Sequence, residues 1–188
     1  MKRIASVILT GALILSMGAA AFAATPSKTV ADEIKADAAV ETTGFDRVSI
    51  STEETEATVA QSAEVVKELA SSTEELKETV GATAEERIEI IAVRTVTSKQ
   101  TPLFNRTKVT VSLSSAVIDA ACTENEQVTV LVMVPVVGKD GTVTYEKIAV
   151  TSGIVKDGKV QVTLTGALLK KIGKRNVTLV AIKKIAKV

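Results

Sequence analysis

The sequence has no histidine, no tryptophan, one cysteine and very few aromatic residues, three Phe and one Tyr among 188 residues. Without histidine there is no Ser-His-Asp or Cys-His catalytic arrangement and no His-ligated metal. A single cysteine excludes intrachain disulfides, zinc sites built from several cysteines, and CxxC redox chemistry. The shortage of aromatic residues argues against a stacking platform for sugars. We therefore expect no cofactor and no metal site.

The formal net charge is only +1, although 46% of the residues are apolar. This apolar fraction is enough for a packed core, and the balanced charge does not steer the chain toward nucleic acid. The motifs GxSxG, GxxxxGK[ST], GxGxxG and HExxH do not occur. The sequence therefore offers no recognised catalytic signature, and nucleic acid is not an expected partner.

The first residues have the layout of a secretory signal peptide. Lys2 and Arg3 precede an uncharged stretch from Ile4 to Ala24, which ends in small residues. Ala21-Phe22-Ala23 fits the A-x-A rule, which predicts cleavage after Ala23 and a signal peptide over residues 1–23. A retained membrane anchor is the alternative, and the sequence leaves that choice open. We expect a bacterial protein that is secreted or associated with the cell surface, with no transmembrane segment after cleavage.

The remaining chain divides into an acidic part and a basic part. Residues 25–91 carry 16 acidic and 6 basic side chains, whereas residues 92–188 carry 6 acidic and 15 basic. The first part is rich in Ala, Glu and Thr, and the second in Val, Thr, Lys and Gly. We predict an acidic helical segment over residues 24–87, partly disordered at its N-terminal end, followed by a β domain over residues 88–188. Whether the helices dock on that domain is left open.

The acidic segment carries several helix signals. A short helix is predicted over Val30–Ala39. A longer one follows, capped by Ser51 or Thr52, with an apolar stripe that includes Val59, Val66 and Leu69. Ser72 and Glu75 form a capping box for a second helix that ends at Gly81. The stripe also fits one unbroken coiled coil of barely three heptads, so the expected state is a monomer or a weak oligomer.

The basic part alternates apolar and polar residues, as strands do. Asp140-Gly141 and Asp157-Gly158 are typical of tight hairpin turns. Seven short strands in about 100 residues favour a two-sheet sandwich. The predicted strands cover residues 88–97, 107–113, 127–137, 142–151, 153–156, 159–165 and 177–183.

An internal repeat runs through this part. Residues 108–118 match residues 159–169 at five of eleven positions, with an offset of 51. With the offset reduced by two, residues 128–132 match residues 177–181. Each copy is predicted to form a strand, a short amphipathic helix and a strand. Val117, Ile118, Leu168, Leu169 and Ile172 would close the open end of the core while the chain crosses between the two sheets.

This strand–helical turn–strand pattern, carried by Ile88 to Val96 and by Lys156 to Ile182, resembles small immunoglobulin-like modules of secreted and surface proteins of bacteria. The resemblance covers about half the chain at the level of the fold, and none of its motifs is specific. It implies an immunoglobulin-like β-sandwich that serves as a spacer or a binding module. It implies no catalytic residue.

Basic residues gather toward the C-terminus and are the main candidates for ligand binding: Lys170, Lys171, Lys174, Arg175, Lys183 and Lys184. Their functional interpretation is a patch for an anionic cell-wall polymer or for lipid headgroups. Their structural interpretation is charge at a helix C-terminus and on strand edges. The expected function is a non-enzymatic structural or adhesive module of the cell envelope, with a wall polymer or another envelope protein as partner.

Two further features have alternative interpretations. Cys122 follows Ile118-Asp119-Ala120-Ala121, a mostly apolar run, so we expect a small buried side chain rather than a reactive thiol or an intermolecular disulfide. The many carboxylates allow a secreted hydrolase as an alternative. They cluster on predicted helices, where solvation is their usual role.

Overall fold

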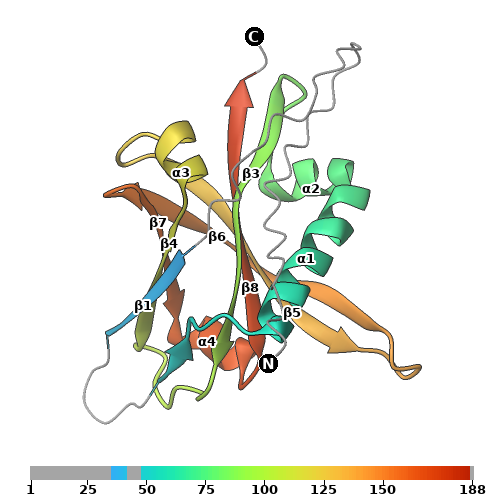
Figure 1. Ribbon diagram of the computed structural model, residues 1–188, viewed down its shortest axis with the longest axis vertical. Helices are drawn as coiled ribbons and strands as arrows, with labels where there is room; N and C mark the ends of the chain where they lie inside the picture. The colour runs from blue at the N-terminus through green and yellow to red at the C-terminus, as the bar shows by residue number, and fades with distance from the viewer. Residues whose placement is uncertain (1–34, 42–47, 187–188) are drawn as a thin grey trace, which may run out of the picture.

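The computed structural model describes residues 35–41 and 48–186, and the predicted signal peptide lies outside them. The chain is mainly β with four helices in the described part (Figure 1). The elements are β1 Lys35–Glu41, β2 Ile50–Ser51, α1 Glu56–Ser71, α2 Thr73–Val80, β3 Glu86–Ser98, β4 Lys108–Ser114, α3 Ala116–Ala121, β5 Gln127–Val137, β6 Val143–Lys156, β7 Lys159–Thr165, α4 Gly166–Ile172 and β8 Asn176–Ala186.

The strands form one continuous antiparallel sheet in the order β1-β4-β7-β6-β5-β8-β3-β2. This sheet curls into a half-barrel, so that β4 and β7 face β3 and β8 across the core (Figure 1). The predicted two-sheet sandwich is therefore not confirmed. The long strands β3, β5, β6 and β8 continue around the curl, and an alternating sequence pattern does not distinguish one curled sheet from two stacked ones.

The predicted strand positions are largely confirmed. β5 and β7 begin and end at the predicted residues. The two segments predicted at 142–151 and 153–156 are one strand, β6, because Ser152 and Gly153 continue the pairing with β5. The short helix predicted over Val30–Ala39 is wrong for its described part, since residues 35–41 form β1 and pair along the full length of β4.

Two apolar clusters lie on the two faces of the sheet. The larger one fills the concave face, with Val111, Val162 and Leu179 fully buried. The smaller one lies on the convex face, where Val65 and Leu69 of α1 and Leu76 and Val80 of α2 pack against β3, β5 and β8. The acidic helices thus dock on the sheet.

Helix α1 starts later than predicted and turns a different face toward the sheet. Its N-cap is Thr55, which exchanges hydrogen bonds with Thr58 in a capping box. The buried face includes Gln61, whose Nε2 donates to Thr178 Oγ1 at 3.0 Å. Because the buried face of α1 includes the polar residue Gln61, Val65 lies on that face, whereas the predicted apolar stripe contained Val66. The chain also breaks at Ser72 between α1 and α2, so the unbroken coiled coil is wrong. Helix α2 starts after Ser72 and ends at Gly81 as predicted, but the predicted capping box is wrong, because the Ser72 side chain makes no capping hydrogen bond.

The two segments of the predicted repeat form β4–α3–β5 and β7–α4–β8 within one sheet. Ser115 caps α3 by accepting from Ile118 N, and Thr165 caps α4 by accepting from Leu168 N. β4 pairs with β7, and β5 pairs with β8. Val111 lies opposite its own repeat equivalent, Val162. A pseudo-two-fold axis therefore passes between the copies. Ile118, Leu169 and Ile172 are fully buried in the concave core, as predicted, whereas Val117 and Leu168 are only partly buried against it.

The structure extends the repeat to β3 and β6. The register shifts between Ile90 and Ala92 in β3, and the matching shift in β6 leaves Ile148 as the extra residue. Residues 89–93 and 146–150 share four of five residues, at an offset of 57. One copy is thus β3–β4–α3–β5 and the other is β6–β7–α4–β8. We call them copy 1 and copy 2.

The copies differ most in the connection between their first two strands. β6 and β7 are joined by the tight turn at Asp157-Gly158, where both residues have positive φ. The offset falls from 57 residues between β3 and β6 to 51 between β4 and β7, so the loop of residues 99–107 is six residues longer than its counterpart. This insertion breaks the symmetry of the half-barrel at one end.

Candidate functional site

The six predicted basic residues do not form one patch. Lys170 and Lys171 lie on α4, and Lys174 and Arg175 lie in the turn that follows it. Lys183 and Lys184 lie near the far end of β8, eight residues beyond Arg175. At roughly 3.3 Å per residue, this separates the two groups by about 25 Å.

Lys183 has a structural role. Its Nζ lies 2.8 Å from Glu126 Oε1 and also donates to the carbonyl oxygen of Ala121 at the end of α3. Burial opposes ionisation of Glu126, but hydrogen bonds from Lys183 and Thr123 hold the pKa of its carboxyl below the ordinary value of 4.5. Lys183 thus fastens β8 to the loop after α3, so we remove it from the candidate site.

The four basic residues around α4 lie together. Lys170 Nζ donates to Asn105 Oδ1 at 2.8 Å. Arg175 donates from Nε to Ile172 O and from Nη2 to Lys171 O, which caps the C-terminus of α4. None of these four cations forms an ion pair with a carboxylate of residues 48–186. Their charge is available to a ligand.

The inserted loop of residues 99–107 is fastened to this basic group. Ser98 N donates to Arg175 O at 3.0 Å, which joins the start of the loop to the turn after α4. Gly166 lies so close to the loop that a Cβ there would overlap the carbonyl oxygens of Phe104 and Asn105, the latter at 2.7 Å. Only glycine allows this approach.

The loop adds apolar and basic side chains to the surface. Leu103 is 70% exposed and Phe104 is 41% exposed. The guanidinium carbon of Arg106 lies 5.2 Å from the centre of the Phe104 ring, a cation–π distance. Residues 99–107 and 166–175 together carry six basic side chains and no carboxylate. We call these two segments the basic end.

Sequence reasoning missed the loop's part in the basic end. The available signal was the pair Leu103-Phe104, which directly follows Pro102 in a segment without acidic residues. The sequence alone does not show that this pair lies in an insertion. The tight pairing of β6 with β7 in the other copy shows it.

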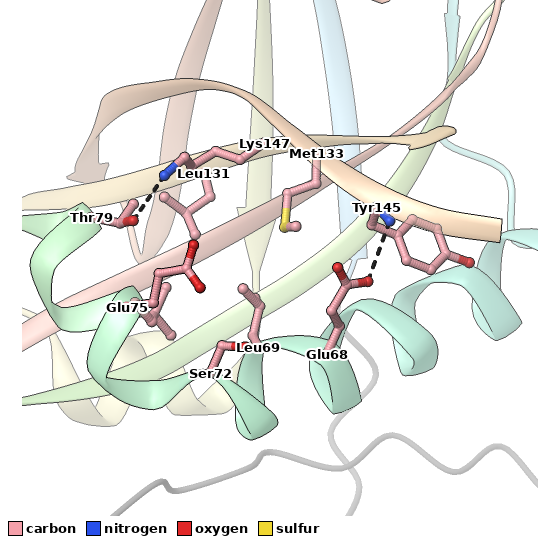
Figure 2. A pocket seen from close by; sticks show the side chains of 10 residues that line it. Glu68, Leu69, Ser72, Glu75, Thr79, Leu131, Met133, Tyr145 and Lys147 are labelled. Carbon is pink, nitrogen blue, oxygen red and sulfur yellow. Dashed lines mark hydrogen bonds between the residues drawn. The ribbon is translucent and has the colours of Figure 1, made fainter. Parts of the chain in front are cut away.

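A second surface is a shallow groove between the α1–α2 junction and the β5–β6 hairpin (Figure 2). Its volume is about 160 Å³, and its apolar lining comes from Leu69, Leu76, Leu131 and Met133. A cavity of this size admits one or two side chains.

Polar groups border the groove, and most of them already contact each other. Glu68 accepts from Tyr145 N at 3.3 Å, and Lys147 Nζ donates to Thr79 Oγ1 at 2.8 Å (Figure 2). Burial raises the pKa of the Tyr145 hydroxyl, and the nearby charges of Glu64 and Glu68 raise it further. The groove is therefore weakly acidic, opposite in sign to the basic end.

Cys122 packs against the concave core as expected, but it is half-buried rather than fully buried. Burial raises the pKa of its thiol, the charge of Glu126 raises it further, and Lys183 opposes the shift. At neutral pH the group is a thiol rather than a reactive thiolate.

The part of the chain that the structure describes contains no cluster of three or more His, Cys, Asp or Glu residues suited to a metal ion. No helix within residues 35–41 and 48–186 has the length and apolar character needed to cross a membrane. The chain matches no protein-family model, no curated protein and no solved structure.

Proposed function

We propose that the protein is an exported, non-enzymatic adhesive module of the bacterial cell envelope, and that its basic end binds an anionic envelope surface. One observation carries the proposal. The inserted loop and the α4 region together present six basic side chains and no carboxylate. Anionic polymers and anionic lipid headgroups share the chemistry that such a surface attracts.

Two features support a binding role rather than a catalytic one. The concave face, where a curled sheet would hold a substrate, is filled by fully buried aliphatic side chains such as Val111, Leu164 and Leu179. The groove on the other face is small and is bordered by groups that already contact each other. The position of the basic end, outside both clusters, leaves it accessible to a large ligand.

The proposal is tested by binding of the chain from Ala24 to isolated sacculi, to soluble polyphosphate and to anionic lipid vesicles, at low and high salt. Binding to at least one of these anions at low salt, with release at high salt, is the expected result because screening shortens the reach of charge. Each lysine contributes about 1 kcal/mol at such a surface, so the triple variant Lys170→Gln, Lys171→Gln, Lys174→Gln weakens binding roughly a hundredfold.

The matched control removes three other exposed lysines, with the substitutions Lys139→Gln, Lys156→Gln and Lys184→Gln. Both triple variants have the same net charge, so a difference between them reports the location of the charge rather than its amount. Equal losses in the two variants, or no binding to any of the three anions at low salt, would contradict the proposal.

A further inference from the structure

We infer that the basic end attaches to a lipid bilayer with an anionic surface, and that Leu103 and Phe104 insert into its interface while the surrounding cations contact headgroups. The inference rests on the proposed function and names the anionic surface to which the basic end binds. Three observations carry it: where the exposed pair lies, how firmly it is held, and which charges surround it.

The exposed pair lies on the element that distinguishes the two copies. Copy 2 joins its first two strands by the two-residue turn Asp157-Gly158, and the curled sheet accommodates that turn without loss of pairing. In copy 1 the equivalent connection is six residues longer. Leu103 of the longer loop is the most exposed large apolar side chain among the described residues, at 70%, and Phe104 beside it is 41% exposed. The folding of the sheet does not require this addition.

The loop is held in place by α4. Lys170 donates to Asn105, Ser98 donates to the carbonyl of Arg175, and Gly166 packs against the carbonyls of Phe104 and Asn105. A tethered loop loses less conformational freedom when it binds than a mobile one does. Leu103 and Phe104 are thus presented to a partner in a defined position.

The composition of the surface favours a bilayer over an anionic polymer. A polymer satisfies the cations but offers no apolar medium to Leu103 and Phe104. The interface of an anionic bilayer satisfies both, because apolar side chains enter it while Lys and Arg remain among the headgroups. Arg106, whose guanidinium carbon lies 5.2 Å from the Phe104 ring centre, places a cation directly beside the residue that inserts.

The experiment uses the absence of tryptophan from the sequence. In the full-length mature chain, Phe104→Trp introduces the single tryptophan, and its emission is followed on addition of mixed phosphatidylglycerol–phosphatidylcholine vesicles. A blue shift and quenching by brominated acyl chains are expected with these vesicles, and neither with pure phosphatidylcholine. The control is Val137→Trp, because Val137 is 68% exposed on the β5–β6 hairpin, away from the basic end. No shift is expected from it.

A second variant separates insertion from charge. The double substitution Leu103→Ser, Phe104→Ser keeps every cation, so binding to polyphosphate should stay unchanged. Its partition onto anionic vesicles should fall by about tenfold or more, because two buried apolar side chains are lost. Circular dichroism and thermal unfolding confirm that the variant folds, which is expected since both side chains are exposed.

The outcomes distinguish this inference from the proposed function. Equal vesicle binding by the double serine variant and the parent, or no emission shift from Phe104→Trp, overturns insertion and leaves charge-driven binding to an anionic surface intact. A shift from Val137→Trp but not from Phe104→Trp also overturns it, since the hairpin would then be the inserted element. If the parent chain binds neither vesicles nor polyphosphate nor sacculi, both the insertion and the proposed function are overturned.

Discussion

The basic end and its pseudo-symmetric counterpart, residues 115–126 and 156–158, carry net charges of opposite sign. We call this counterpart the opposite end. At the basic end, Ser98 N donates to Arg175 O at 3.0 Å, and at the opposite end the equivalent Val155 N donates to Glu126 O at 2.9 Å. The backbone geometry is therefore the same while arginine is replaced by glutamate. The opposite end also carries Asp119, Glu124 and Asp157.

This comparison indicates which residues the fold requires. Both ends keep a capping hydroxyl, a short helix and a fully buried aliphatic side chain that closes the core. They differ in exposed side chains and in the length of one loop, which packing constrains little. Function is best sought where equivalent positions diverge, and that criterion selects the basic end.

The largest expected effect is on stability and tests whether the two ends contribute equally to the core. Ile118 of α3 and Leu169 of α4 are repeat equivalents, and both are fully buried. Ile118→Ala and Leu169→Ala should each lower the free energy of unfolding by about 2–5 kcal/mol, since each leaves a cavity in the same core. Urea denaturation measures both. If the free energy of unfolding falls by less than about 1 kcal/mol in only one of the two variants, Ile118 and Leu169 are not equivalent in the core.

The next effect sharpens the difference between the ends. Gly166→Ala places a Cβ against two backbone carbonyls of the loop and should cost about 1–3 kcal/mol of stability. The comparison at the opposite end is Gly158→Ala. There the Cβ would meet only the carboxylate of Asp119, which can move, but the backbone φ of +67° costs about 1–2 kcal/mol for a residue with a side chain. Gly166→Ala should also weaken binding by the basic end. Gly158→Ala should leave binding unchanged, and equal binding losses would contradict the role of Gly166.

The third prediction concerns charge at the opposite end. Because the folded-state pKa of Glu126 is lowered, the carboxylate stabilises the fold above its unfolded pKa. This contribution is lost as the pH falls below about 4.5 and through the lower folded-state value. Glu126→Gln should cost about 1–2 kcal/mol at pH 7, discounted for partial exposure, and should reduce the loss of stability on acidification. Unfolding free energies measured from pH 7 to pH 3 test both points. An unchanged pH profile in the variant would contradict the role of Glu126.

The smallest expected effect concerns the caps. Ser115→Ala and Thr165→Ala each remove an acceptor for a backbone N–H at a helix start, and each should cost about 1 kcal/mol. The loss at Ser115 should be the larger, because that side chain is buried and its N–H···O distance is 3.1 Å rather than 3.4 Å. Thermal unfolding of the two single variants compares their stabilities. A larger loss of stability for Thr165→Ala would contradict the prediction that the Ser115 cap is the stronger one.

Strand positions and the end of α2 at Gly81 were predictable because their signals are local. The N-caps were not, since α1 is capped by Thr55 rather than by Ser51 or Thr52. Alternation in β7 and the Asp157-Gly158 turn depend on neighbouring residues only, so β7 was placed correctly. β1 was not, since its Ala-rich sequence favours a helix and only pairing with β4 makes it a strand. The single curled sheet was missed for the same reason. Which strand pairs with which is a long-range property.

The candidate site was predictable in part. Lys170, Lys171, Lys174 and Arg175 lie together as expected, because they are close in sequence. Lys183 and Lys184 are distant from them, because an extended strand separates residues that a sequence window treats as neighbours. Leu103 and Phe104 joined the site through the contacts of Gly166 and Lys170, which link segments about 60 residues apart in the sequence.

The pseudo-two-fold axis also bears on how such a chain arises. Each copy supplies β4 or β7 to one pair and β5 or β8 to the other, so neither copy completes its own hydrogen bonding. A polypeptide of one copy alone would leave these strand edges unpaired unless it associated with a second copy about the same axis. Duplication and fusion remove the need for assembly and free each half to mutate separately. The long loop in one half and the short turn in the other are the kind of asymmetry that a homodimer cannot evolve.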